Sequence, residues 1–464
     1  MNLLNDLYWE KPMSNRRQFV TRSALLALWP VVARQTVLAS PSSLPSWSNW
    51  SGGQTCQNQA LLYPQNEPEL IKILKSTEGT LRAVGGGHSF SPLVPTRGTI
   101  ISLEAMNGLI DHDPKHLQAT FHAGSRIAQA SAELWKVNQG LFNEADINVQ
   151  SLAGALSTAT HGTGRGLQCL SANIIALKLV TAQGDVLNCS RTEHPDVFQA
   201  ARVGLGALGI MTEVTLQNRR SYFLREQVRV MSISEAMLYV DQNKDRFSHI
   251  EFMAFPFGNR AMVKTLEETQ SPETPVRESW LDENTLLEFA ANTAREHPWS
   301  NPGLQHLLGM FVSDSSRVGP SWKIYPSTRA VRFNEMEYQL PAAVGMQACE
   351  EVMTAMRQHK LDVFFPLEFR YVAADDAWLS PFHNRDSVSI SVHQYYRQDY
   401  HPIFAVIEPI LRRHGGRPHW GKLNTLNGRD FQEIYPHWED FRRTQRQIDP
   451  RGRMLNSYLR RILA

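Results

Sequence analysis

The sequence has few cysteines, no excess of charge of one sign and no internal repeat. Its four cysteines, at positions 56, 169, 189 and 349, lie too far apart for a short-spaced zinc motif or a dense disulfide framework, although a single bridge remains open. Lys and Arg number 47 against 45 acidic residues, and no basic stripe interleaved with aromatics occurs, so we expect no nucleic-acid partner. We also expect no metal site.

Long apolar runs are missing beyond the N-terminal region, so we expect no membrane-spanning helix. What is present is ordinary for a soluble globular protein: 42% hydrophobic and 20% charged residues. A chain of 464 residues has room for two or three domains.

The first forty residues have the features of an export leader. Arg16-Arg17 precede an apolar run at 24–33, and Val37-Leu38-Ala39 supplies small residues for cleavage. Pro30 interrupts the run, which is too short to span a bilayer. Residues 1–40 are therefore predicted to be a twin-arginine signal peptide and the mature protein periplasmic or secreted, with membrane association as the alternative. A disordered or buried N-terminal helix is the other interpretation.

A short apolar strand at 80–84 runs into Gly85-Gly86-Gly87-His88-Ser89. Residues without a side chain let the backbone fold tightly and present successive N–H groups to an anion such as a diphosphate. A nucleotide fold of the Rossmann type would instead open a helix here, which Pro92 disfavours. A glycine-rich surface turn with an incidental histidine is the alternative for this stretch alone.

Two further small-residue tracts, at 150–166 and 204–210, offer more backbone donors. Four motifs thus stand in order: Gly85 to Ser89, Thr160-His161-Gly162-Thr163-Gly164, Gly206-Ala207-Leu208-Gly209-Ile210 and His419-Trp420-Gly421-Lys422. Together they resemble the flavoprotein family of vanillyl-alcohol oxidase and p-cresol methylhydroxylase (PCMH), and within it the branch of sugar-lactone and alditol oxidases. The resemblance extends from about residue 46 to the C-terminus.

The resemblance implies an α+β fold with two domains. Residues 41–218 would form a PCMH-type FAD-binding domain, and residues 219–464 a mixed α/β substrate domain whose C-terminal segment returns to the flavin. It also implies that FAD is bound covalently through His88, which would raise the reduction potential of the flavin; hydrogen bonding without a covalent bond is the alternative. The cofactor-binding residues it implies are Gly85, Gly86, Gly87, His88, Ser89, Ala145, Ala153, Gly154, Ser157, Thr158, His161, Gly162, Gly209, Ile210 and His419.

Downstream strands carry the candidate catalytic residues. Alternation along 364–372 puts Glu368 and Arg370 on one face, where they could grip vicinal hydroxyls or a lactone carbonyl, or form a surface salt bridge. His393 stands where the resembling oxidases have a threonine, as a substrate contact, a proton acceptor or a structural histidine. By resemblance Lys422 lies beside the flavin and the substrate hydroxyl, where its charge would stabilise a forming alkoxide.

Two further positions bear on the substrate. In the oxidases that this sequence resembles, the residue at the place of Ala145 borders the flavin face approached by oxygen, and alanine there is compatible with an oxidase or a dehydrogenase. Asp146 stands where the resembling alditol oxidases have a serine. We expect it either to contact the substrate together with Glu368, Arg370 and Lys422, or to cap a helix or turn.

These residues predict an FAD-dependent oxidoreductase that acts on a CH–OH group of a sugar lactone, alditol or related polyol. Its electron acceptor would be oxygen, a quinone or a cytochrome. The alternative is an exported flavin-binding or carbohydrate-binding protein without catalysis. The arginine-rich tail at 442–461 is expected to be a solvated helix face, or a surface for peripheral membrane contact.

Overall fold

The structure is a computed structural model that describes residues 46–275 and 283–463. Residues Leu44–Ala464 form one compact unit. The predicted leader at 1–40 lies outside the described residues. Among the helices that the structure describes, none is long and apolar enough to cross a membrane. The four cysteines are all free thiols, so the single bridge left open by their spacing does not form.

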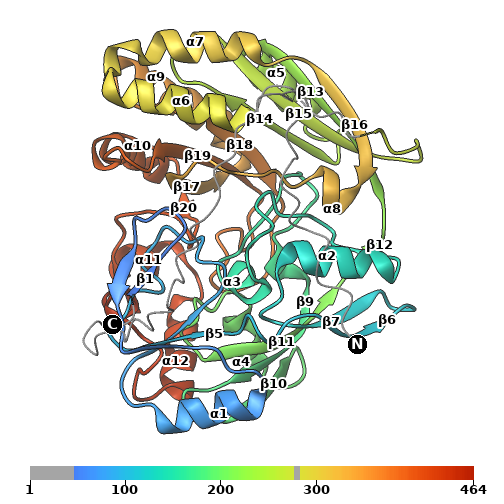
Figure 1. The fold of residues 1–464 in the computed structure, drawn as a ribbon, viewed down its shortest axis with the longest axis vertical. Helices are drawn as coiled ribbons and strands as arrows, with labels where there is room; N and C mark the ends of the chain where they lie inside the picture. Colours follow the sequence, from blue (N-terminus) through green and yellow to red (C-terminus); the bar gives the residue numbers. More distant parts are fainter. Residues whose placement is uncertain (1–45, 276–282, 464) are drawn as a thin grey trace, which may run out of the picture. The chain divides into compact units, whose positions relative to one another are not determined.

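The first part of the chain builds one parallel and one antiparallel sheet (Figure 1). The parallel sheet has the order β3 (Ala60–Leu62), β5 (Thr99–Ser102), β4 (Leu81–Val84). The antiparallel sheet has the order β10 (Val186–Ser190), β9 (Ile174–Val180), β11 (Ile210–Gln217), β7 (Gln118–His122), β6 (Leu109–Asp113). Its helices are α1 (Glu67–Ser76), α2 (Ile127–Lys136), α3 (Leu152–Leu156) and α4 (Pro195–Arg202).

Helix α1 shows how local sequence sets these elements. The side chain of Asn66 caps its N-terminus by accepting a hydrogen bond from the Glu69 N–H, and Pro68 occupies the first turn, where a missing N–H costs nothing. Leu70 and Leu74, one turn apart, face the core. The helix predicted from these residues is confirmed.

The second part of the chain builds an eight-stranded sheet whose neighbouring strands all run antiparallel. The strand order is β16 (Ser315–Pro320), β13 (Phe223–Ser232), β15 (Arg260–Thr269), β14 (His249–Ala254), β18 (Leu367–Val372), β19 (Ser387–Tyr395), β17 (Phe333–Pro341), β20 (Arg417–Pro418). Two short two-stranded sheets pair β1 (Ser46–Ser48) with β2 (Thr55–Gln57) and β12 (Arg219–Arg220) with β8 (Gln139–Gly140).

The two faces of this sheet differ in chemistry. One face carries apolar side chains such as Phe252, Phe369 and Ile390, which belong to the main hydrophobic core. Of the helices that contact the sheet, α5 (Ile233–Asn243) lies against β14, α10 (His401–Arg413) against β17 and α9 (Gly345–Gln358) against β19. The other face carries Glu368 and Arg370, as alternation along the strand predicts. The remaining helices of this part are α6 (Glu283–Glu296), α7 (Asn301–Phe311) and α8 (Ser321–Ile324).

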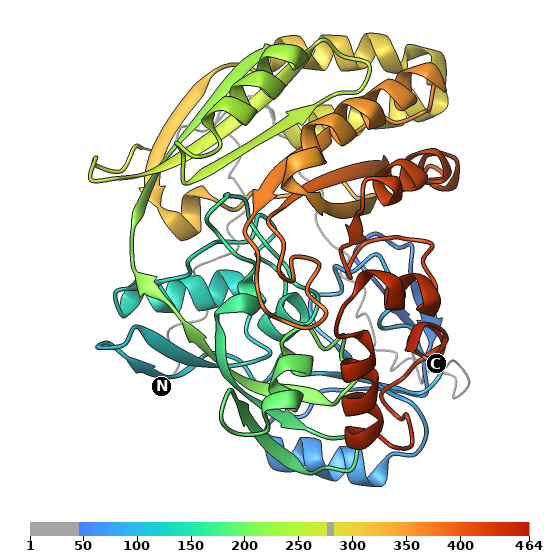
Figure 2. The same cartoon turned by 180° about the vertical axis from the view of Figure 1, so that it is seen from behind.

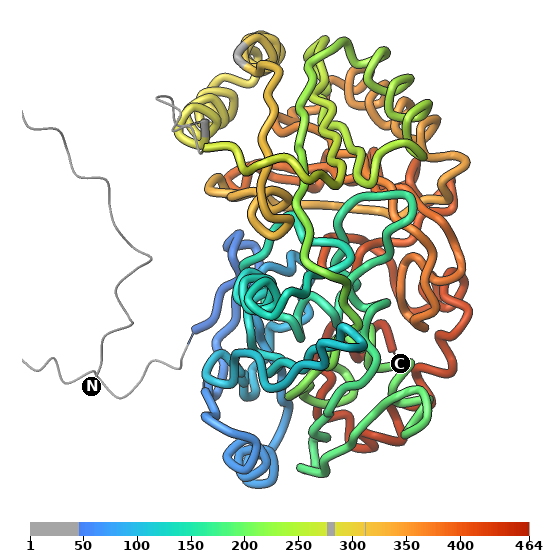
Figure 3. The backbone as a smooth tube through the Cα atoms, turned by 90° about the vertical axis from the view of Figure 1, so that its right-hand side faces the viewer, coloured from blue at the N-terminus to red at the C-terminus, as the bar shows by residue number. Residues whose placement is uncertain are grey.

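The C-terminal segment returns to the first part of the chain, as Figures 2 and 3 show for the red segment. It contains α11 (Gly428–Ile434), α12 (Trp438–Ile448) and α13 (Ser457–Leu463), and α12 packs against α4. Asn456 donates to the carbonyls of Pro92 and Pro95, each at 2.9 Å. Arg453 donates to the carbonyls of Leu74, Thr77 and Ala182. The tail is therefore not simply a solvated helix face, because Arg453 anchors it to the first part.

The expected α+β class is confirmed. The division at residue 218 stays a prediction, although β11 ends and β13 begins close to it. Strand β17 had no counterpart among the predicted elements, and it matters because it carries Glu335 and Glu337.

Candidate active site

The three glycine-rich tracts come together around one cavity. This glycine-lined cavity has a volume of about 1150 Å³, part of it open to solvent. Gly85 to Ser89 leave the end of β4, the second tract forms α3 and its flanks, and the third leads into β11. The predicted cofactor residues that line the cavity are Gly85, Gly86, Gly87, His88, Ser89, Ala153, Gly154, Ser157, Thr158, Gly209 and Ile210.

Glycine is required at two of these positions for different reasons. A Cβ atom on Gly85 would lie 1.9 Å from the Oγ of Ser151, the residue that caps α3 by accepting from the Gly154 N–H. Gly87 has a φ of 68°, a conformation that side chains rarely adopt. The loop therefore approaches the α3 N-terminus closely and leaves backbone N–H groups available to a diphosphate.

Arg82 supplies positive charge in the wall of the glycine-lined cavity. Its guanidinium is buried and donates to the carbonyls of Leu93, Leu205, Gly206 and Met454, none of which carries a charge. Burial lowers the pKa of Arg82 to about 9, so the side chain stays cationic at neutral pH. A cavity with free backbone donors and an uncompensated cation fits the diphosphate of a dinucleotide such as FAD.

A second cavity lies next to the first, and the two share His88, Ser89, Gln150 and Thr158 in their walls. This charged cavity has a volume of about 680 Å³, part of it open to solvent. It contains the predicted catalytic residues Glu368, Arg370, His393 and Lys422, together with Asp146, His161 and His419. Ala145 is fully buried and, like Gly162, lines neither cavity.

His88 stands where the two cavities meet. Its ring stacks on Trp50 with 5.3 Å between ring centroids. Burial, and then the positive charges of Lys422 and Arg126, lower the pKa of His88 to about 4. The imidazole is therefore uncharged at neutral pH, and one ring nitrogen keeps a free lone pair.

Strand register assembles the charged cavity. Residues directly opposite each other in an antiparallel sheet share a face. Glu335 pairs with His393 between β17 and β19, while Glu368 pairs with Ser391 and Arg370 with Ser389 between β18 and β19. One polar face thus brings together side chains that are far apart in the sequence. Glu335 and His393, for example, are 58 positions apart.

Glu368 and Arg370 form the buried ion pair that their spacing suggests. Arg370 Nη2 lies 2.5 Å from Glu368 Oε1, and its Nε lies 3.3 Å from Glu251 Oε2. Glu251 in turn binds Lys264 at 2.9 Å. The pair is therefore not a solvated surface bridge but part of a buried network at the cavity wall.

Asp146 is held by protein groups. Its Oδ1 accepts from Ser327 Oγ at 2.6 Å, its Oδ2 from Arg329 Nη2 at 2.9 Å, and its backbone carbonyl from the Ser327 N–H at 3.0 Å. Burial alone would raise the pKa of Asp146, but Arg329 and Arg370 hold it well below its usual range. Asp146 reaches the cavity, yet it mainly clamps the Ser327–Arg329 segment over it.

Lys422 places its ammonium between two carboxylates of β17. It forms a salt bridge with Glu335, and its Nζ lies 3.7 Å from Glu337 Oε2. Burial would lower the pKa of Lys422, but these two carboxylates raise it, so the lysine is cationic. The turn that carries it is fixed by hydrogen bonds from the Phe90 N–H to Gly421 O and from the Leu423 N–H to Glu335 O.

His393 faces the same carboxylate. Its Nδ1 donates to the Pro366 carbonyl at 3.0 Å, which leaves Nε2 3.5 Å from Glu335 Oε1. Burial opposes ionisation of Glu335, but Lys422 lowers the pKa of that carboxyl to about 2. His393 therefore lies at the cavity wall beside a carboxylate that is ionised at neutral pH.

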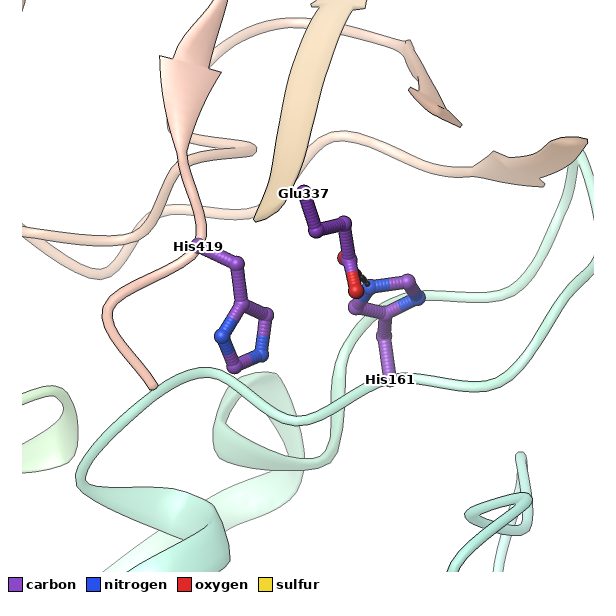
Figure 4. Close-up of side chains that lie close together, drawn as sticks. All are labelled: His161, Glu337 and His419. Atoms are coloured by element: carbon purple, nitrogen blue, oxygen red, sulfur yellow. Dashed lines mark hydrogen bonds and ion pairs between the residues drawn. The ribbon is translucent and has the colours of Figure 1, made fainter. Parts of the chain in front are cut away.

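His161, Glu337 and His419 point toward one another from three separate segments (Figure 4). All three are buried, and their possible metal-ligand atoms lie within 4.8 Å of one another. Glu337 already accepts hydrogen bonds from His161 at 2.7 Å and from Ser389 at 2.9 Å. The Lys422 ammonium beside it would repel a metal ion, so this geometry favours a hydrogen-bonded cluster over a metal centre.

Sequence reasoning missed Glu335, Glu337, Glu251 and Arg329, although Arg329 and both β17 carboxylates line the charged cavity. One signal was available, because the segment Phe333–Pro341 alternates: Met336, Tyr338 and Leu340 face the core, and Glu335 and Glu337 lie on the other face. Two carboxylates on one buried strand require cationic partners.

Comparison with known proteins matches two sequence models to successive parts of the chain. The sequence model described as FAD binding domain matches residues 58–190, and that of D-arabinono-1,4-lactone oxidase matches residues 214–462. L-gulono-1,4-lactone dehydrogenase of Mycobacterium tuberculosis is 35% identical over 427 residues, which cover 90% of this chain and 99% of that protein. Alditol oxidase of a Streptomyces species is 27% identical over 437 residues, covering 90% and 98%.

Among solved structures, cholesterol oxidase from B. sterolicum superposes with a TM-score of 0.74 over 90% of this chain and 96% of that one. At 16% identity this likeness concerns the fold alone. The fold and the paired cavities thus define an FAD-dependent oxidoreductase with the architecture of the vanillyl-alcohol oxidase and PCMH flavoproteins. Within that class, the chain belongs to the D-arabinono-1,4-lactone oxidase family.

Proposed function

We propose that this protein oxidises a CH–OH group of a sugar lactone, alditol or related polyol that binds in the charged cavity. The observation that supports this most directly is the pairing of the two cavities at His88, with a carboxylate, a guanidinium and an ammonium group on the far side. Relatives named for L-gulono-1,4-lactone, D-arabinono-1,4-lactone and alditols support the substrate class.

The residues of the charged cavity have distinct roles in this proposal. FAD, when bound, accepts the hydride that leaves the carbinol carbon with its electron pair. Lys422 stabilises the negative charge that develops on the oxygen as the hydroxyl proton leaves. Arg370 donates to substrate oxygens and Glu368 accepts from a neighbouring hydroxyl, which orients the carbon. His393, or water, takes the hydroxyl proton.

The direct test is an anaerobic substrate panel. Purified holoprotein is mixed with L-gulono-1,4-lactone, D-arabinono-1,4-lactone and a series of alditols, and the flavin absorbance is followed. We expect at least one of them to bleach the flavin. Binding of the sugars without bleaching by any of them would instead favour a protein that binds carbohydrate without turnover.

We also propose that FAD is attached covalently through His88, for which its uncharged imidazole between the two cavities is suited. One ring nitrogen of His88 would hold the flavin covalently, with oxygen as the two-electron oxidant, and this bond would raise the reduction potential of the flavin. Acid-precipitated protein should stay yellow, and His88→Ala should release the colour to the supernatant. A colourless pellet from the unsubstituted protein would contradict this attachment.

The electron acceptor and the location are proposals of the same kind. We infer an acceptor among oxygen, quinones and cytochromes, export through the twin-arginine route, and at most peripheral membrane contact. Peroxide formation measured beside reduction of a soluble quinone and of cytochrome c distinguishes the acceptors. Replacing both Arg16 and Arg17 with Lys should leave holoprotein in the cytoplasmic fraction, and unchanged periplasmic recovery would exclude this route.

A further inference from the structure

The basic side chains of the charged cavity face carboxylates of the protein itself. Among the described residues, the Lys and Arg side chains in its lining are Arg329, Arg370 and Lys422. Lys422 forms a salt bridge with Glu335, and its Nζ lies 3.7 Å from Glu337 Oε2. The positive charge of Lys422 is thus compensated within the protein.

The two arginines are compensated by Asp146 and Glu368. Asp146 Oδ2 lies 2.9 Å from Arg329 Nη2 and 3.5 Å from Arg370 Nη2. Glu368 Oε1 lies 2.5 Å from the same Arg370 nitrogen and 3.9 Å from Arg329 Nη2. Two carboxylates therefore lie beside two guanidinium groups, and these four charges cancel at the cavity wall.

The charges behind this wall cancel as well. Arg370 Nε lies 3.3 Å from Glu251 Oε2, and Glu251 Oε1 lies 2.9 Å from Lys264 Nζ. Burial would lower the pKa of Lys264, but Glu251 raises it, so the lysine is cationic. The next carboxylate, Glu226, has its own partner in Arg317 at 2.6 Å. Removal of one carboxylate from the cavity wall would therefore leave one positive charge uncompensated.

Asp146 is the carboxylate whose loss a ligand would meet most directly. The side chain of its partner Arg329 is 31% exposed, against 8% for Asp146 itself, and both line the cavity. A ligand can therefore contact Arg329. With the Asp146 carboxylate already beside this guanidinium, an incoming carboxylate would meet a like charge. A hydroxyl group or a lactone carbonyl meets no such repulsion.

We propose that Asp146 is a specificity-determining residue: it makes the charged cavity select uncharged lactones and polyols over aldonates, the carboxylates into which lactones hydrolyse. This deepens the proposed function and rests on it. The selection is electrostatic, because Asp146 occupies the guanidinium of Arg329 that would otherwise pair with a carboxylate of the ligand.

Equilibrium binding tests this selection without turnover. Holoprotein whose flavin has been photoreduced cannot oxidise a sugar, and it is titrated by anaerobic calorimetry with fresh L-gulono-1,4-lactone or with sodium L-gulonate. At about pH 7 the gulonate is ionised. The unsubstituted protein should bind the lactone at least about thirtyfold more tightly than gulonate. In Asp146→Asn the ratio of the two Kd values should fall by at least about tenfold, because gulonate gains the Arg329 guanidinium.

The effect should depend on Arg329 and on charge. The double variant Asp146→Asn/Arg329→Met removes both charges, and its affinity for gulonate should return to that of the unsubstituted protein. Ser327→Ala removes a hydrogen bond to Asp146 but keeps the carboxylate, so the selection should persist. The matched control is Asp399→Asn, which removes an exposed carboxylate paired with His401 and should leave both affinities unchanged.

An equal Kd ratio in Asp146→Asn and the unsubstituted protein would overturn the proposal, as would equal affinity of the unsubstituted protein for lactone and gulonate. If Asp146→Asn does not fold, Asp146→Ser replaces it, with the same fall in the ratio expected. Lactone binding with the expected selection but without flavin bleaching in the substrate panel would contradict only the proposed function. Binding of neither sugar would overturn both.

Discussion

The glycine-lined cavity and the charged cavity share a wall but recognise their contents in opposite ways. The first offers backbone N–H groups and one buried guanidinium, and its shape depends on the absence of side chains. The second is lined by four carboxylates, namely Asp146, Glu335, Glu337 and Glu368, which face Arg329, Arg370 and Lys422. A diphosphate needs only the backbone N–H groups of the glycine-lined cavity, because N–H dipoles stabilise its negative charge. A polyol needs donors and acceptors at defined positions, which the side chains of the charged cavity supply.

Substitutions in the two cavities should therefore have different effects. Those in the glycine-lined cavity should abolish FAD binding, whereas those in the charged cavity should leave FAD bound but lower the rate of flavin reduction or the stability of the protein. The following changes test this difference, from the largest expected effect to the smallest.

Gly85→Ala should give the largest effect. Its Cβ would lie 1.9 Å from Ser151 Oγ, so either the loop or the α3 cap must move. We expect protein that is purified with less than about a tenth of the normal flavin content, from the ratio of absorbance at 450 and 280 nm, because a strained loop no longer presents its N–H groups.

Two variants control this result. Gly166→Ala adds a methyl group where no atom lies within 4 Å and should keep its flavin. Removing the clash in Gly85→Ala with Ser151→Ala should recover part of the flavin, since the Ser151 Cβ stays at 3.1 Å. Full flavin content in Gly85→Ala alone would mean that close approach of this loop to α3 is not needed.

Lys422→Met should distinguish the role of the charged cavity in catalysis from that of the glycine-lined cavity in FAD binding. We expect the flavin content to be normal and the rate constant of anaerobic flavin reduction to fall by about a hundredfold to a thousandfold, as when one donor to a developing oxyanion is removed. Stopped-flow absorbance measures the rate on the same sample that shows the flavin content. An unchanged rate would remove Lys422 from the chemistry.

This contrast also explains what the sequence could predict. The glycine-rich loops could be predicted because their conformation depends on glycine at particular positions, which the sequence shows directly, as at Gly85 and Gly87. Glu368, Arg370, His393 and Lys422 were found by alternation and by resemblance. Asp146 was assigned to substrate, but its partners Ser327 and Arg329 follow about 180 positions later and their contact depends on tertiary structure.

Glu335 and Glu337 were not found at all, for a related physical reason. An acidic residue at every second place of a strand usually indicates a solvated face, and only the pairing of β17 with β19 shows that this face is buried. The lysine that compensates them lies beyond position 420. No local pattern links the two.

Asp146→Asn should have an intermediate effect. It removes the carboxylate 2.9 Å from Arg329 Nη2 and leaves that nitrogen only Glu368 Oε1, at 3.9 Å. We expect a loss of about 2–3 kcal/mol in the free energy of unfolding, with KM raised several-fold and flavin content unchanged. Because the pKa of Asp146 is lowered on folding, its stabilisation is present at neutral pH and is lost as the pH falls below about 4.

Denaturant unfolding at about pH 7 and about pH 2.5 measures this. The difference between the unsubstituted protein and Asp146→Asn should be larger at neutral pH. Ser327→Ala, which removes one hydrogen bond to Asp146 but keeps the ion pair, should cost about 1 kcal/mol at either pH. Equal stability of Asp146→Asn and the unsubstituted protein at neutral pH would mean that Asp146 does not hold the Ser327–Arg329 segment in place.

Glu144 should give the smallest effect, and it sharpens the comparison because it is a buried carboxyl group with no cationic partner. Its Oε2 accepts from Ser131 Oγ at 2.9 Å, and burial raises its pKa from 4.5 to about 7. The folded protein then keeps a proton that the unfolded chain has lost, so the free energy of unfolding falls as the pH rises from 4.5 to about 7.

Glu144→Gln should reduce this fall by about 1–3 kcal/mol in denaturant titrations across that range, whereas Glu433→Gln, on an exposed helix, should not. An unchanged slope in Glu144→Gln would mean that Glu144 is ionised in the folded protein, and that buried carboxylates near these cavities do not need the cations that Asp146, Glu335 and Glu337 have.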